Sequence, residues 1–250
     1  MISFCLATRG RPQIFSRFYN SIMDTAKNPD RIEFITYHDD DDLTIKDYEV
    51  KPNITRIIGP RVPNHLMVNM CWKKARGDIF GHMADDFVFK TKNWDEAVKI
   101  AFDAYRDKIV LVWPNDNWYR SAFGTAFFLH RVWTNITGYL AAPYFVGQYV
   151  DNWWNEVSTL IHRRCFLRRV YVIHEYSDDQ VHLDYITRSK AANSRQLFAS
   201  DEMLKKRVED AVKLLAFMEQ CSSHGNYGVS EIGNNKRLTR EEISKGVSFY

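Results

Sequence analysis

The sequence has few of the features that mark secreted, membrane-spanning or fibrous proteins. Its 250 residues include only four cysteines, far apart and without a C-x-x-C pair, which predicts free or buried thiols in a reducing compartment. No stretch approaches the roughly 20 apolar residues that a membrane helix needs. The apolar start, Met1 to Ala7, is followed rather than preceded by positive charge, so it predicts a strand and not a signal peptide. We therefore expect a cytoplasmic protein without a membrane partner.

A strong charge of one sign is also missing. Lys plus Arg is 34 and Asp plus Glu is 31, which leaves a net charge of +3 and a pI near 8.6. Hydrophobic residues make up 45% and charged residues 26%, which indicates a globular protein rather than collagen, a coiled coil or a disordered chain. The mild positive charge is compatible with an anionic small molecule and does not by itself establish a nucleic-acid partner.

Short apolar runs alternate with amphipathic segments in the first half of the chain. The runs predict strands at Ile2–Ala7, Arg31–Tyr37, Thr55–Ile58, Asp78–Met83 and Ile109–Trp113. Apolar residues at helical spacing predict helices at Pro12–Thr25, Asn64–Ala75 and Trp94–Arg106. Strands that alternate with helices favour an α/β fold with a mostly parallel central sheet flanked by helices.

The second half is less regular and more aromatic. The pattern predicts strand-rich structure over Ser121–Arg131, a helix over Arg131–Leu140, a loop or helix start over Pro143–Asn155 and a strand over Phe166–His174. Ser200 is expected to cap a long amphipathic helix, because two acidic residues follow it and an apolar stripe runs from Leu204 through Val208, Ala211 and Leu215 to Met218. We assign no structure to Ser222–Tyr250.

Polar clusters follow three of the predicted strands, at Thr8–Arg9, Asp39–Asp42 and Asp85–Asp86. In parallel sheets, ligands bind beyond the carboxyl ends of the strands. The adjacent carboxylates of Asp85 and Asp86 repel one another, so a site that keeps both ionised needs a nearby cation. Mg²⁺ or Mn²⁺ with a diphosphate meets that need, because both ions prefer oxygen ligands. A solvated turn or a helix cap is the simpler alternative for such a pair.

Two more residues are candidates for chemistry. His174 follows a predicted strand and is either a metal ligand or a structural histidine. Asp151 lies in the aromatic segment Tyr149–Trp154, where burial would raise its pKa and suit it to act as a general base. The alternative for Asp151 is a helix cap or an arginine partner.

Taken in order, these motifs resemble a known family. TRGRP after the first strand, HDDDD after the second, then Arg61 and Asn69, ADD after the fourth strand and the TKNWD segment resemble the GT-A glycosyltransferases, closest to their family 2-like branch. TAFFLHR, YVDNW and His174 resemble the acceptor-side half of that branch. The resemblance covers roughly residues 1–200. It implies a GT-A (Rossmann-like) fold with a nucleotide-binding half at 1–113, an acceptor-side half at 114–200, and a C-terminal helix and polar tail at 201–250.

The resemblance also implies individual roles on the donor side. Residues expected to bind a nucleotide-sugar donor, such as a UDP-sugar, are Thr8, Arg9, Arg11, Asp39, Asp40, Arg61, Asn69 and Asp85. Asp86 matches the last carboxylate of the D-x-D motif and is expected to bind Mn²⁺ or Mg²⁺ together with His174. Ala84 occupies the first position of that motif, which removes one carboxylate and gives His174 more weight.

On the acceptor side, Asp151 matches the catalytic base of inverting members. The neighbouring aromatic residues Tyr149, Trp153 and Trp154 are expected either to stack on a sugar or base face or to belong to the core. The acceptor is expected to be either a saccharide or a 5-hydroxymethylpyrimidine in bacteriophage DNA, which would place the protein in the host cytoplasm. For DNA, Arg163 and Arg164 belong to a basic and aromatic cluster that suits a phosphate backbone.

Two other classes stay open at this point. A nucleotidyltransferase also uses a nucleotide-binding α/β sheet, but it favours a glycine-rich phosphate loop, and residues 8–11 contain one glycine. A non-catalytic nucleic-acid-binding module would use the arginines around residues 163–169 and would bind more weakly as salt increases.

Overall fold

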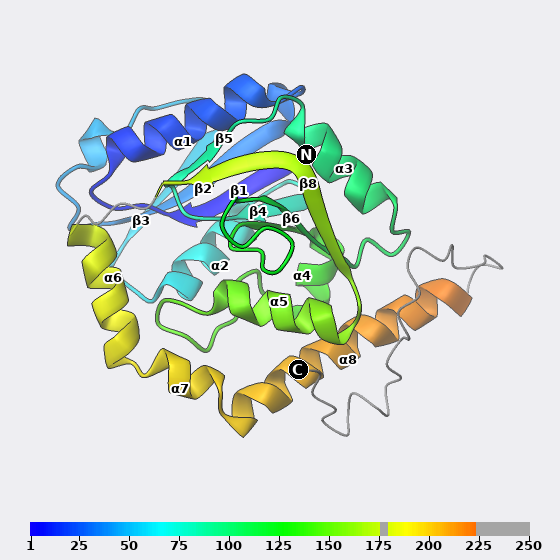
Figure 1. Ribbon diagram of the computed structural model, residues 1–250. Coiled ribbons are helices and arrows are strands. Elements are labelled where there is room, and N and C mark those ends of the chain that lie inside the picture. The colour runs from blue at the N-terminus through cyan, green and yellow to red at the C-terminus, as the bar shows by residue number, and fades with distance from the viewer. Residues whose placement is uncertain (176–179, 224–250) are drawn as a thin grey trace.

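A computed structural model describes residues 1–175 and 180–223 (Figure 1). Its strands are β1 (Ile2–Ala7), β2 (Ile32–Asp39), β3 (Ile54–Gly59), β4 (Ile79–His82), β5 (Phe87–Phe89), β6 (Leu111–Asn115), β7 (Phe127–His130) and β8 (Arg164–His174). Its α-helices are α1 (Pro12–Thr25), α2 (Asn64–Lys74), α3 (Trp94–Asp103), α4 (Arg131–Thr137), α5 (Val150–Leu160), α6 (Gln180–Ala191), α7 (Ser194–Phe198) and α8 (Asp201–Ser223). Short 3-10 helices lie at Pro29–Arg31 and Ile45–Asp47. Of the tail at 222–250, to which the sequence pattern assigns no structure, residues 224–250 lie outside the described part of the chain.

The strands form one sheet in the order β3-β2-β1-β4-β7-β6-β8-β5. β3, β2, β1 and β4 are parallel neighbours, and β7 runs antiparallel between β4 and β6. The long strand β8 pairs in parallel with β6 along its first half and antiparallel with β5 at its end. The predicted α/β class with a mostly parallel central sheet is therefore confirmed, and the carboxyl ends of β1, β2, β4 and β6 share one edge.

Helices cover both faces of the sheet, with α1 and α3 on one face and α2, α4 and α5 on the other (Figure 1). Strand β1 shows why, because its side chains alternate between the two faces. Phe4 packs with residues of α1 and α3, and Cys5 packs with residues of α2. Gly81 of β4 lies beside this core, where a Cβ atom would be 2.8 Å from the Phe4 ring. A glycine is required there because the backbone of β4 approaches the ring so closely.

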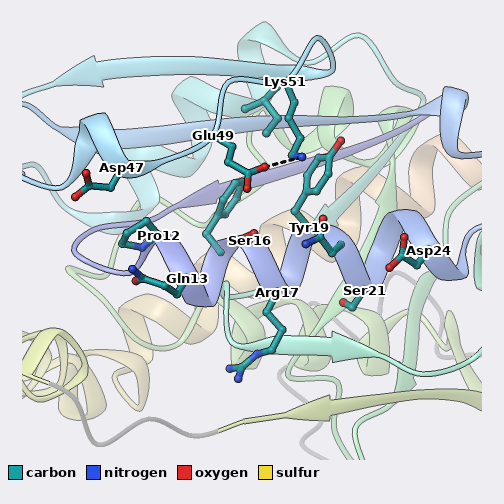
Figure 2. A pocket seen from close by; sticks show the side chains of 13 residues that line it. Pro12, Gln13, Ser16, Arg17, Tyr19, Ser21, Asp24, Asp47, Glu49 and Lys51 are labelled. Atoms are coloured by element: carbon teal, nitrogen blue, oxygen red, sulfur yellow. Dashed lines mark ion pairs between the residues drawn. The ribbon is translucent and has the colours of Figure 1, made fainter.

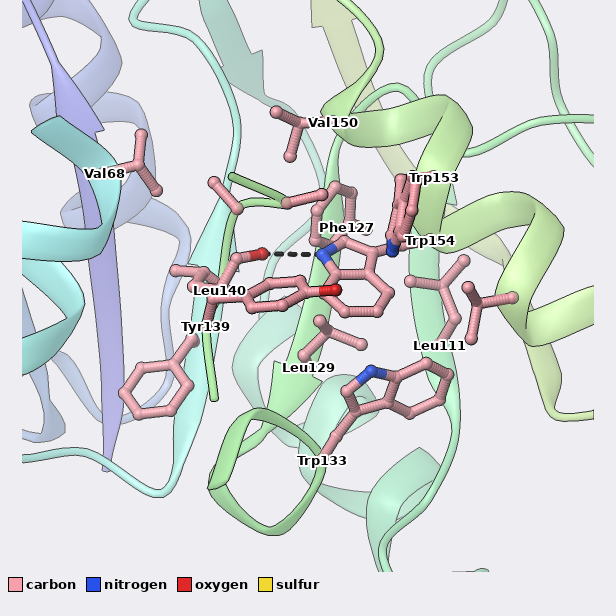
Figure 3. Packing of buried hydrophobic residues seen from close by; sticks show 14 of the residues in the cluster. Val68, Leu111, Phe127, Leu129, Trp133, Tyr139, Leu140, Val150, Trp153 and Trp154 are labelled. Carbon is pink, nitrogen blue, oxygen red and sulfur yellow. Dashed lines mark hydrogen bonds between the residues drawn. The ribbon is translucent and has the colours of Figure 1, made fainter. Parts of the chain in front are cut away.

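Helix α8 packs against α4 and α5, as the amphipathic pattern predicts. Ser200 caps it, since the backbone N–H of Met203 donates to the Ser200 hydroxyl over 3.3 Å. Buried Asp210 on α8 accepts hydrogen bonds from the Tyr139 hydroxyl and, over 3.1 Å, from Trp153 Nε1. Figure 3 shows Tyr139 and Trp153 in the core that this helix helps to close.

The sequence pattern does not predict β5, α6 or α7. β5 has three residues, too few for a period to show, and α7 has five. β2 extends two residues beyond its predicted end, to Asp39, because it pairs with β3 as far as Gly59. Within 1–175 and 180–223, none of the helices combines the length and the apolar character that crossing a bilayer requires.

Candidate active site

A cavity of about 820 Å³ opens at the carboxyl edge of the sheet. Its walls come from the ends of β1 and β2, the loop after β4, the start of α5, the end of β8, and α6. The charged and histidine side chains that line it are Arg9, Arg11, Asp39, Arg61, His82, Asp85, Asp86, Asp151, His174 and Arg188. Segments more than a hundred residues apart in sequence therefore contribute to one concave surface.

Asp85 is held rigidly at the base of this cavity. The Thr8 hydroxyl donates to Asp85 Oδ2 over 2.6 Å, and the Arg11 guanidinium lies 3.5 Å from Asp85 Oδ1. Tyr48 lies within 3.0 Å of the Thr8 hydroxyl and accepts from the backbone N–H of Arg11. Burial raises the pKa of Asp85 to about 6, although Arg11 and Thr8 both act to lower it.

Asp86 and His174 meet although 88 positions separate them in the sequence (174 − 86). Strand β8 places His174 opposite Phe87 of β5, and the two rings stack with centroids 4.1 Å apart. His174 Nε2 lies 3.2 Å from Asp86 Oδ1. Apart from this contact, the buried Asp86 Oδ1 accepts no hydrogen bond from the described residues. A carboxylate and an imidazole thus converge on one point at the cavity wall.

Arginines surround Asp39 at the end of β2. Arg9 Nη1 lies 3.1 Å and Arg61 Nε 3.6 Å from Asp39 Oδ2. Burial raises the pKa of Asp39, and the two arginines act against that shift. Asp39 Oδ1 is buried and accepts no hydrogen bond within the described residues, so it is available to a ligand hydroxyl or N–H. Arg61 also pairs with Asp184 of α6, which links that helix to the donor side.

The later acids of the HDDDD run are used by the protein itself. Asp42 accepts from the backbone N–H of Gly10 over 2.9 Å and from Thr44, so it fixes the loop after β1. Asp41 pairs with Arg9, and Asp40 is exposed and does not line the cavity. Of the predicted pair, Asp39 is therefore the one that lines the cavity.

Asp151 lies in the first turn of α5 and lines the same cavity. The backbone N–H of Asn152 donates to its Oδ1 over 3.0 Å. Burial raises the pKa of Asp151 to about 6, whereas this hydrogen bond and the charge of His174 act to lower it. Tyr149, just before the helix, has φ of 83°, a left-handed conformation that is uncommon for a tyrosine and found most often at functional sites.

Comparison with known proteins now places this architecture. No family model and no curated protein sequence matches the chain. A mannosyltransferase from Pyrobaculum calidifontis, solved with GDP-Man and Mn²⁺, matches with a TM-score of 0.59 and 12% identity over 90% of this chain and 76% of that one. S. aureus TarS 1-349, solved with UDP-GlcNAc, matches with a TM-score of 0.56 and 10% identity over 90% of this chain and 74% of that one.

This chain has a GT-A-like glycosyltransferase fold. The predicted resemblance in fold is therefore confirmed. Sequence identities near 10% do not assign roles to individual residues. We therefore ask of each predicted site residue whether it lines the cavity. Ten of the predicted site residues line the same cavity: Thr8, Arg9, Arg11, Asp39, Arg61, Asp85, Asp86, Tyr149, Asp151 and His174.

Three of the predicted site residues are structural instead. Asn69 of α2 does not line the cavity, because its side-chain amide bonds to the backbone of Leu140 and Ala141. Trp153 and Trp154 are fully buried in the core, where their indole N–H groups donate to Asp210 and to the Leu140 carbonyl. The prediction that these indoles stack on an acceptor is wrong, because no face of either ring reaches the cavity.

The predicted acceptor contacts of Arg163 and Arg164 also need correction. Arg164 is the first residue of β8 and Arg163 directly precedes it, at the opposite end of that strand from His174. Arg163 pairs with Asp107 over 2.9 Å, and Arg164 lies over the Trp113 ring at 4.8 Å. These arginines hold the amino-terminal end of β8 in place and do not line the cavity.

The structure adds residues that the sequence pattern misses. Trp118 and Tyr119 line the cavity from the loop after β6, and Arg188 lines it from α6. Ligands bind beyond the carboxyl ends of parallel strands, and the loop after β6 follows such an end. The same argument would therefore have identified Trp118 and Tyr119. Arg188 lacked such a signal, because no helix is predicted around it.

A second hollow of about 580 Å³ lies along the outer side of α1 and shares no lining residue with the first (Figure 2). Its charged groups are largely paired, since Lys51 contacts Glu49 over 2.7 Å and Arg17 contacts Glu175 over 2.6 Å. Lys51 also lies over the Tyr19 ring. The candidate active site is the cavity at the sheet edge, because that cavity gathers the carboxylates and the histidine that the sequence pattern singles out.

Proposed function

We propose that this protein transfers a sugar from a nucleotide-sugar donor to an acceptor hydroxyl with inversion of configuration. The observation that carries the proposal is that one cavity of a GT-A-like fold is lined by Asp85, Asp86 and His174 and also by Asp151. In the reaction, the acceptor oxygen bonds to the anomeric carbon as the bond from that carbon to the diphosphate breaks. The acceptor proton goes to Asp151, and the nucleoside diphosphate leaves.

Positive groups on the donor wall suit a leaving diphosphate. Arg11 lies within 3.5 Å of Asp85 and 3.8 Å of Asp86, and Arg9 and Arg61 lie around Asp39. Arg188 is one helical turn beyond Asp184, the residue through which α6 pairs with Arg61, so it faces the same side. Preorganised cations of this kind stabilise charge that develops as the bond breaks. Asp39 Oδ1 would accept from the base or ribose of the nucleotide, which we expect to be uridine.

Asp86 and His174 fit a divalent cation. Mn²⁺ accepts both carboxylate and imidazole ligands, and the buried Asp86 Oδ1 has no other polar contact within the described residues. No third His, Cys, Asp or Glu joins them in the described parts of the chain, so the diphosphate and water would complete the coordination. Bound there, Mn²⁺ or Mg²⁺ would neutralise the charge on the leaving diphosphate.

Asp151 is suited to remove the acceptor proton. A carboxylate with an ordinary pKa is a weak base at neutral pH, and burial strengthens it by raising the pKa of Asp151 to about 6. Of the two predicted acceptors, a saccharide is favoured over a pyrimidine in phage DNA. Arg163 and Arg164, the residues expected to hold a DNA backbone, are occupied elsewhere in the fold.

A thermal-shift experiment tests the donor site. UDP, GDP and dTDP are each added with Mn²⁺, and at least one is expected to raise the melting temperature, because a ligand that binds only the folded state stabilises it. Asp86→Asn should remove the metal-dependent part of the shift. Asp40→Asn, which changes an exposed carboxylate outside the cavity, is the matched control and should behave like the wild type. Absence of a shift with all three nucleotides would contradict the proposal.

Product analysis separates the proposal from the alternatives. A glycosyltransferase should release nucleoside diphosphate slowly from a nucleotide-sugar even without an acceptor. Pyrophosphate release from a nucleoside triphosphate would favour a nucleotidyltransferase. A mass increase on 5-hydroxymethylated DNA would identify phage DNA as the acceptor.

A further inference from the structure

The loop between β6 and β7 is built around one buried carboxylate. Asp116 Oδ1 accepts the backbone N–H groups of Trp118, Tyr119 and Arg120 at 2.9–3.1 Å. Its other oxygen accepts the Thr125 hydroxyl over 2.8 Å. These bonds satisfy three N–H groups of the loop backbone internally and help to hold its conformation.

The fixed loop holds two large aromatic side chains in solvent at the cavity. Trp118 is 66% exposed and Tyr119 is 54% exposed, and both line the cavity that contains Asp151 and His174. Trp118 is the one exposed tryptophan of the seven in the chain. Phe123 braces Tyr119, with the two rings 5.5 Å apart in an edge-on arrangement. Exposed aromatic area costs free energy in water, so rings presented this way at a cavity mark a binding surface.

We propose that Trp118 and Tyr119 form the platform on which a sugar ring of a saccharide acceptor stacks. The inference rests on the proposed function and deepens it by naming the acceptor class. The C–H face of a pyranose is apolar and covers an aromatic ring well, while its hydroxyl edge stays free for hydrogen bonds. Trp118 and Tyr119 would thus provide the stacking surface for the acceptor that the sequence pattern assigned to Trp153 and Trp154, which are buried.

The polar groups near Asp151 fit a neutral polyhydroxyl compound better than a polyanion. Gln148 and Asn152, which flank Asp151 in the sequence, line the cavity with uncharged amides. Three of the four arginines that line the cavity approach acidic residues of the proposed donor side, since Arg9 and Arg61 contact Asp39 and Arg11 approaches Asp85. A DNA backbone would need cations on the acceptor wall as well. Uncharged amides next to an aromatic face are the combination that binds a saccharide.

Ligand-observed NMR titration tests the platform directly. The probes are maltose, cellobiose, lactose and diacetylchitobiose, each added to the full chain with UDP and Mn²⁺. At least one should bind, and Trp118→Ala should weaken that binding about tenfold, the loss expected for one apolar sugar face. Trp118→Tyr keeps a ring and should restore most of the affinity. Tyr171→Ala removes an exposed aromatic outside the cavity and is the matched control, with no expected effect.

The UDP thermal shift, recorded on the same samples, separates the two proposals. If UDP binds but no saccharide does, or if Trp118→Ala leaves saccharide binding intact, the platform is overturned and the donor site stands. If a thymidine oligonucleotide binds through Trp118 in place of the saccharides, the acceptor class is wrong. Saccharide binding that depends on Trp118 without any nucleotide shift would support the platform and contradict the donor site.

Discussion

On the proposed donor side of the cavity, carboxylates face arginines, whereas Asp151, on the proposed acceptor side, lies in the aromatic segment Tyr149–Trp154 and accepts a backbone N–H. Arg9 and Arg61 contact Asp39, and Arg11 lies between Asp85 and Asp86. Within the described residues, no lysine or arginine pairs with Asp151, whose carboxylate accepts the Asn152 backbone N–H and is otherwise influenced by the charge of His174. Arginines therefore act on the pKa of the carboxylates on the proposed donor side, whereas burial is the main influence on the pKa of Asp151.

This difference matches the two tasks that we propose. A wall that binds a charged nucleotide benefits from cations that are already in place, because their positions need not change during the reaction. A general base benefits from burial without a cation, because a paired carboxylate would hold its proton too weakly. The surroundings of each aspartate thus suit it either to ligand binding or to proton transfer.

The largest effect is expected from Asp151→Asn, which keeps the shape of the side chain and removes the base. Loss of a general base reduces a rate by about 10²- to 10⁴-fold. The sugar-transfer rate should fall by that amount, while the thermal shift with UDP and Mn²⁺ stays unchanged. An Asp151→Asn protein with the full transfer rate would exclude Asp151 as the base.

Asp210→Ala should destabilise the acceptor side next most strongly. The substitution leaves the buried donors of Tyr139 and Trp153 without an acceptor, and each unsatisfied group costs about 1–3 kcal/mol. Denaturant unfolding should show a loss of about 2–4 kcal/mol. Glu209→Ala on the exposed side of α8 is the control and should change stability by less than about 0.5 kcal/mol. Equal losses for the two variants would argue against the buried network.

The pH dependence of transfer sharpens the contrast further. Burial raises the pKa of Asp151 to about 6, and a base works only when unprotonated. The value of kcat/KM should therefore be constant above that pH and fall about tenfold per pH unit below it. Unfolding measured over the same range controls for acid denaturation. A profile that stays flat down to about pH 4.5 would be incompatible with an elevated pKa at the base.

The smallest effect is expected from the double variant Arg168→Ala and Arg169→Ala. Both side chains are exposed on β8, outside the cavity. Stability should change by less than about 0.5 kcal/mol, and transfer should be unaffected. A large loss of affinity for DNA in this variant, steepest at low salt, would instead favour the nucleic-acid-binding hypothesis.

Local patterns predicted which residues at the ends of β1, β2 and β4 line the cavity, because these residues directly follow apolar strands. Thr8, Asp39 and Asp85 come at the ends of strands whose alternation is visible in the sequence, and a parallel sheet brings such ends to one edge. The acceptor side was predicted less well. An aromatic residue looks alike in sequence whether it lies in the core, as Trp153 does, or in solvent, as Trp118 does.

The sequence by itself determined the α/β class, the order of the main strands and the acidic residues that end them, since these depend on short-range periodicity and backbone geometry. Only the tertiary structure decided that Asp86 contacts His174, that Asp210 of α8 accepts a hydrogen bond from Trp153, and that Trp118 lines the cavity. Those facts arise from long-range packing, in which the three-residue strand β5 receives the end of β8. Such contacts leave no periodic signal along the chain, because each is a single meeting of distant side chains.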